Sequence, residues 1–129
     1  MIDKVQYWKD LADEDLLVAE DMLKTKHWLY VGFMCHQAIE KIEKAYWCAK
    51  KSDIEAPYTH NIHLLAESSG LSAKMTTAQL HFLHIMLPLN IEARYPDYKS
   101  SVAASLNEAR CIDILTTTKD LVAWIKSMC

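Results

Sequence analysis

Residues 29–49 constrain the fold more than any other segment of the chain. Their apolar side chains recur at intervals of three and four, which is typical of a helix that buries one wide face. These positions are Val31, Met34, Cys35, Ala38, Ile39, Ile42, Ala45, Tyr46 and Ala49. The opposite face carries Glu40, Lys41, Glu43 and Lys44, and Glu40 lies one helical turn before Lys44. We therefore expect a central helix with a charged outer face, against which the other helices pack.

The rest of the chain predicts further helices, because Gly and Pro together contribute only five of 129 residues. We expect helices over about residues 4–24, 29–50, 60–67, 73–87 and 103–127, with loops over 52–59 and 90–102. The predicted fold is an all-α, up-and-down bundle of four longer helices with one short extra helix. A chain of this length is expected to form a single domain spanning residues 1–129.

Local signals suggest where these helices begin and end. Asp3 is a candidate N-cap for the first helix, Thr59 for the short helix and Ser72 for the fourth. Gly70 is expected to end the short helix, and Pro88 to kink or end the fourth. In the last helix, the predicted buried positions include Leu106, Ala109, Ile112 or Asp113, Leu115, and either Leu121 or Val122.

Composition and charge argue against several classes of protein, among them general nucleic-acid binders, secreted proteins and membrane proteins. The formal net charge of −3 argues against a general nucleic-acid binder but leaves room for a local basic pocket. None of the four cysteines belongs to a Cys-x-x-Cys pair, so we interpret them as reduced thiols of a cytoplasmic protein. The charged N-terminus is unlike a secretory signal, and the longest uncharged run, residues 75–91, is a poor membrane span.

Histidine pairs are the only metal-like pattern in the sequence. His60 and His63 are three residues apart, as are His81 and His84, so each pair can share one helical face. The carboxylates of helical-bundle metal sites are missing, because the chain has no Glu-x-x-His sequence. We predict no metal and no other cofactor, with a metal-binding bundle as the remaining alternative. With only two glycines, a glycine-rich phosphate loop is excluded.

The segment 94–99 is the strongest candidate for ligand binding. Arg94 can clamp a phosphate, Tyr95 can stack on a base, and Asp97 lies beside them. The structural alternative is that Arg94 caps the preceding helix or pairs with Asp97, while Tyr95 packs on the end of the bundle.

Four stretches resemble the HEPN-domain family in their order and spacing. They are Tyr7-Trp8 with Ala12, Asp15-Leu16 and Ala19-Glu20; CHQAIEK at 35–41 with Lys44-Ala45; Thr59-His60-Asn61-Ile62 with Leu64-Leu65; and ARYPD at 93–97. The resemblance covers nearly the whole chain and implies a helical bundle that forms a homodimer. Many members accompany a minimal nucleotidyltransferase, often as a toxin–antitoxin pair. Others are metal-independent ribonucleases with an Arg-x4–6-His motif placed across the dimer.

The chain departs from the family at this ribonuclease motif. After Arg94, the positions for the histidine hold Lys99, Ser100 and Ser101, and Arg110 has none at the matching positions either. The missing group matters because His is the side chain best suited to moving a proton near neutral pH.

We therefore predict a non-catalytic module that dimerises, and that pairs with a nucleotidyltransferase or binds a nucleotide, RNA or another polyanion. The candidate binding residues are Arg94, Tyr95, Asp97, Lys44, Lys41, Gln37, Glu40 and His60. For the charged residues of the central helix, the alternative is a solvated face stabilised by pairs one turn apart. The alternative function is a ribonuclease with a degenerate motif, in which Arg94 stabilises the phosphate and His60 acts as the base.

Overall fold

The computed structural model describes residues 3–51, 55–91 and 96–129. In these residues the chain forms six α-helices, two short 3-10 helices and no strand, which confirms the predicted all-α fold. The elements are α1 (Lys4–Lys24), α2 (Trp28–Lys50), α3 (Ile62–Ser68), η1 (Leu71–Lys74), α4 (Thr77–Met86), η2 (Leu87–Leu89), α5 (Pro96–Ala104) and α6 (Glu108–Lys126). None of the described helices is long and apolar enough to cross a membrane.

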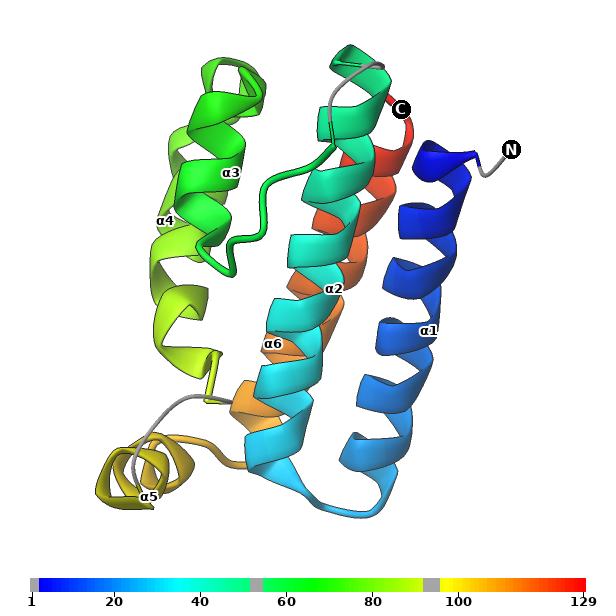
Figure 1. Cartoon of the computed structure of the whole chain (residues 1–129). Helices are drawn as coiled ribbons and strands as arrows, with labels where there is room; N and C mark the ends of the chain where they lie inside the picture. Colours follow the sequence, from blue (N-terminus) through cyan, green and yellow to red (C-terminus); the bar gives the residue numbers. More distant parts are fainter. Residues whose placement is uncertain (1–2, 52–54, 92–95) are drawn as a thin grey trace.

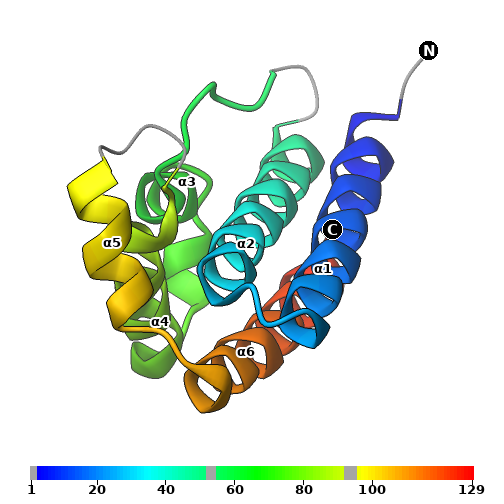
Figure 2. The same ribbon diagram turned by 90° about the horizontal axis from the view of Figure 1, so that it is seen from below.

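Helix α2 is the centre of the bundle, as predicted. It packs against α1 and α6, the two other long helices, while α3 and α4 lie on its side away from α1 (Figure 1). Helix α5 crosses the lower end of the molecule, beside α3 and α4 when the bundle is viewed from below (Figure 2). Thirteen of the 23 residues of α2 are buried, more than in any other described helix, so this helix contributes most to the core.

Helices α1 and α2 have the predicted bounds to within a residue or two. The Asp3 side chain accepts a hydrogen bond from the Gln6 backbone N–H at 3.1 Å, which caps α1 as expected. Ala12 and Ala19 are fully buried, and their small side chains let α1 approach its neighbours closely. The short link after Lys24 makes α1 and α2 antiparallel neighbours.

The predicted caps of the short and fourth helices are wrong. Asn61, not Thr59, caps α3, because its side chain accepts hydrogen bonds from two backbone N–H groups of the first turn. Thr76, not Ser72, caps α4 through a capping box with Gln79. Ser72 instead belongs to the 3-10 helix η1, which follows Gly70 at its positive φ of 84°.

The last part of the chain also differs from the prediction. The expected loop 90–102 contains most of α5, which begins at Pro96, where a missing N–H costs nothing. The expected long helix is interrupted before Asn107, whose side chain caps α6 at the Arg110 N–H. This new start changes which side chains face the core. Ala109, Ile112 and Asp113 are exposed, whereas Leu106, Leu115, Leu121 and Val122 are all buried.

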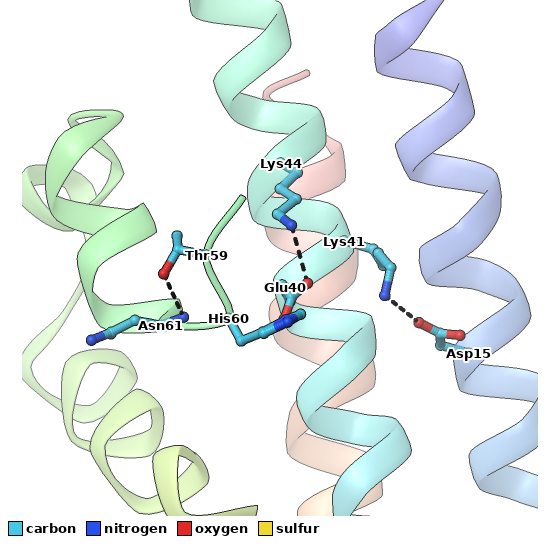
Figure 3. A network of polar contacts seen from close by, with 7 residues as sticks. All are labelled: Asp15, Glu40, Lys41, Lys44, Thr59, His60 and Asn61. Carbon is cyan, nitrogen blue, oxygen red and sulfur yellow. Dashed lines mark hydrogen bonds and ion pairs between the residues drawn. The ribbon is translucent and has the colours of Figure 1, made fainter. Parts of the chain in front are cut away.

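The charged face of α2 is not in solvent, contrary to the prediction. Glu40 and Glu43 are 2% and 0% exposed, Lys44 is buried, and only Lys41 is half-buried. The reason is tertiary: α1 places Asp15 against Lys41 and Trp8 against Lys44, and His60 lies against Glu40 (Figure 3). A periodic pattern identifies the apolar face of a helix but cannot show that a second layer covers the polar one.

Candidate functional site

The centre of the candidate site is the buried carboxylate of Glu40 on α2. Its Oε1 lies 2.8 Å from Nδ1 of His60, and its Oε2 lies 3.2 Å from Nζ of Lys44 (Figure 3). A carboxylate can only accept hydrogen bonds, so Nδ1 of His60 carries the proton that it donates to Glu40. The imidazole is therefore fixed in orientation, and its other nitrogen, Nε2, takes no part in this contact.

The chain before α3 places His60 over Glu40 through local turns. Thr59 accepts a hydrogen bond from the Asn61 N–H at 3.2 Å. Asn61 in turn accepts from the N–H groups of His63 and Leu64, at 3.1 Å and 3.0 Å. Because the residues on both sides of His60 are fixed by such bonds, the histidine is held in place by its backbone as well as by Glu40.

A cavity of about 340 Å³ opens beside this histidine. Its described lining consists of His60, Asn61, Leu87 and Asn90, which supply an imidazole, two carboxamides and one aliphatic side chain. The Asn61 oxygen is already used to cap α3, so its amide group is a donor toward the cavity. Three of these four residues are polar, so the cavity offers hydrogen-bonding groups to a small molecule, with Leu87 as the apolar contact among the described residues.

A second ion pair lies next to the first, between α1 and α2. Nζ of Lys41 is 3.5 Å from Oδ2 of Asp15 (Figure 3). Burial raises the pKa of Asp15, while the charge of Lys41 acts in the opposite direction. The side-chain oxygen of Gln37, on the same helix, is also buried. Nζ of Lys44 also lies 5.1 Å from the ring centre of Trp8, a cation–π contact.

Two more ionisable side chains, His36 and Glu43, are fully buried on α2 close to Glu40. Burial lowers the pKa of His36 to about 4, so its ring is neutral at physiological pH. Burial, together with the nearby charge of Glu40, raises the pKa of Glu43 well above its usual range. Neither carboxyl oxygen of Glu43 has a hydrogen-bond partner in the part of the chain that the structure describes.

Sequence reasoning gave no role to His36 and assigned Glu43 to the exposed face. The usable signal was the spacing of His36, Glu40 and Glu43, at i, i+4 and i+7, which aligns them on one stripe of the helix.

The predicted site residues are only partly brought together. Glu40, Lys44 and His60 form one network, and Lys41 and Gln37 lie beside it on the same helix. Asp97 is exposed in the first turn of α5. Arg94 and Tyr95 lie outside the described residues, so their predicted roles stay predictions.

Neither histidine pair forms part of a larger ligand cluster in the described residues. There, no group of three or more His, Cys, Asp or Glu side chains is arranged to hold a metal ion. His63 pairs with Glu67 at 3.4 Å, and His81 and His84 are exposed on α4. The four cysteines are free thiols.

Comparisons with known proteins agree with the fold. The sequence model of the HEPN domain matches residues 5–128. The crystal structure of TT1696 from Thermus thermophilus superposes with a TM-score of 0.82, covering 99% of this chain and 100% of that one. The two sequences are only 16% identical, so this likeness shows the fold alone. A search of curated protein sequences gave no significant match.

Proposed function

Since this chain belongs to the HEPN-domain family, we propose that it is a binding module that takes a nucleotide or another phosphate-bearing anion beside His60. The observation that carries this proposal is the fixed imidazole of His60, which Glu40 orients at 2.8 Å and which lines a cavity of about 340 Å³. Carboxamide N–H groups donate to phosphate oxygens and match the edge of adenine, and an imidazole with its proton on Nδ1 offers Nε2 as an acceptor to an N–H or O–H group of a nucleotide. ARYPD, at 93–97, would supply Arg94 as the phosphate clamp, with Tyr95 and Asp97 beside it.

The same proposal includes two protein partners. Family membership supports a homodimer and a pairing with a minimal nucleotidyltransferase in a toxin–antitoxin-like system. Light scattering on the purified chain tests the first, with twice the monomer mass expected. Co-purification with a minimal nucleotidyltransferase encoded next to it tests the second. A monomer that co-purifies with no such enzyme contradicts both.

Thermal unfolding with and without ATP tests nucleotide binding. A ligand at one hundred times its Kd stabilises the native state by about 2.7 kcal/mol, which raises the unfolding midpoint. We expect His60→Ala and Arg94→Ala to remove most of this rise. His81→Ala is the matched control, because His81 is an exposed histidine on α4. Absence of any rise in the unaltered protein contradicts the proposal.

A second function, RNA cleavage, is favoured by one specific observation: the Glu40–His60 contact is the geometry of a carboxylate that orients a catalytic base. In this reaction Nε2 of His60 takes the proton of a ribose 2′-hydroxyl. The 2′-oxygen then bonds to the adjacent phosphorus while the bond to the 5′-oxygen breaks, and that oxygen leaves with a proton from solvent.

Gel analysis of a labelled RNA separates this function from binding alone. Cleavage that disappears in His60→Ala but persists in His81→Ala supports a ribonuclease. An unaltered protein that binds ATP and leaves the RNA intact supports the binding module alone.

A further inference from the structure

A second cavity, of about 250 Å³, lies on the other side of the Glu40–Lys44 pair from His60. It is lined by Lys4, Tyr7, Trp8 and Glu55. Tyr7 is 50% exposed, and its ring meets the Trp8 ring edge to face, with 5.2 Å between the ring centres. Two aromatic rings around a surface cavity form an apolar wall to which a planar ligand can stack.

Charged groups surround these rings. Nζ of Lys4 and Oε1 of Glu55 form an ion pair of 2.6 Å at this cavity. Nζ of Lys44 lies over the Trp8 ring. A ligand in this cavity therefore meets aromatic rings, an ammonium group and a carboxylate. A nucleobase can stack on the rings, and its backbone phosphate can pair with the ammonium group.

The two cavities are close to each other and share one segment of the chain. Lys44 touches both the Trp8 ring and Glu40, and Glu40 contacts His60, so two side chains connect the cavities. Glu55 lines the second cavity, and His60 lines the first.

Tyr58 lies between Glu55 and His60 in the same segment, with 98% of its surface exposed. A ring this open leaves both of its faces accessible to a base.

We propose that the second cavity and Tyr58 form a stacking site for a neighbouring base of a single-stranded nucleic acid whose phosphate or first base lies beside His60. This inference rests on the proposed function and extends its ligand from a mononucleotide to a strand. A mononucleotide fills one cavity, whereas a strand reaches both.

Fluorescence anisotropy tests this inference with a labelled single-stranded oligoadenylate of about eight nucleotides. Both the ribo- and the deoxyribo-oligomer are used, because the comparison shows whether the protein prefers RNA or DNA. AMP is titrated as a competitor to measure mononucleotide binding. The informative variants are Tyr58→Ala and Tyr7→Ala, because Tyr58 has almost no packing to lose and Tyr7 is half exposed. Tyr58→Phe and Tyr7→Phe keep the rings, and Tyr30→Ala removes an exposed ring from the opposite end of α2.

We expect the oligomer to bind the unaltered protein more tightly than AMP does. Each Tyr→Ala change should weaken oligomer binding by about fivefold to one hundredfold and leave AMP binding unchanged. The Tyr→Phe variants and Tyr30→Ala should bind the oligomer as the unaltered protein does. If AMP binds but the oligomer binds no more tightly, or if both Ala variants bind it normally, this inference is overturned and the proposed function stands. If the unaltered protein binds neither AMP nor the oligomers, both are overturned.

Discussion

Replacing Glu43 with glutamine tests how a carboxyl group buried without a partner is tolerated in the core. Glu43 is 0% exposed, and neither of its oxygens has a hydrogen-bond partner among the residues that the structure describes. Its side chain is out of contact with solvent, and the charge that affects it is the carboxylate of Glu40. Both conditions favour the neutral acid, so we expect folded Glu43 to keep its proton at pH 7.

The size of the effect follows from proton linkage. An unfolded glutamate titrates near pH 4.3, so at neutral pH the unfolded chain has lost a proton that the folded chain retains. The pKa of Glu43 is raised in the folded state, so the stability of the fold falls as pH rises above the unfolded value. The slope is about 1.4 kcal/mol for each pH unit, and it continues until folded Glu43 itself ionises. Glutamine, which is neutral and of similar shape, removes this slope.

Urea unfolding followed by circular dichroism measures this difference between about pH 5 and pH 8. The free energy of unfolding of Glu43→Gln, minus that of the unaltered protein, should grow steadily with pH. Glu14→Gln is the control, because Glu14 is exposed on α1, and its difference should stay nearly constant. Parallel curves for Glu43→Gln and the unaltered protein would refute the reasoning, since they would mean that Glu43 is ionised in the fold.

Three further predictions concern a buried ion pair, a helix cap and a cysteine. Glu40→Ala leaves the buried Lys44 ammonium without its partner and should cost about 3–5 kcal/mol in urea unfolding, whereas truncating an exposed ion pair costs less than about 1 kcal/mol. Asn61→Ala removes the cap of α3 and should cost about 1 kcal/mol by the same assay, well above the effect of Thr59→Ala. Cys129, the only one of the four described cysteines that is not buried, should be alkylated first in the native protein, as mass spectrometry of labelled peptides would show.

The sequence was most informative where apolar periodicity is long and uninterrupted. Helices α1 and α2 were predicted closely, because more than 20 residues in each repeat one pattern between clear ends. The last third of the chain was predicted less well. There the Asn107 side chain caps a new helix inside a continuous helical pattern, and α5 begins at Pro96 in a segment that composition alone describes as a loop. A single capping hydrogen bond can set where a helix begins, and the spacing of apolar residues does not reveal it.

The candidate site shows a different limit. Glu40, Lys44 and His60 were all named from the sequence, but the charged face of α2 was assigned to solvent. Periodicity describes one helix at a time, and the burial of Glu40 depends on a segment twenty residues later, where His60 folds back over it. The contact joins two stretches of the family resemblance, whose meeting in space no local pattern predicts.

Stability does not explain why a carboxylate occupies position 40. Burying the Glu40–Lys44 pair costs desolvation of both charges, and well-packed apolar side chains often stabilise a core as much or more. The exposed pairs, such as Lys126 with Asp13 at 2.6 Å, avoid this cost but contribute little. A buried carboxylate does supply something that an apolar side chain cannot, namely an acceptor that fixes the proton of His60 on Nδ1. The contact of Glu40 with His60 is therefore better explained by the orientation that it gives the imidazole than by the stability of the bundle.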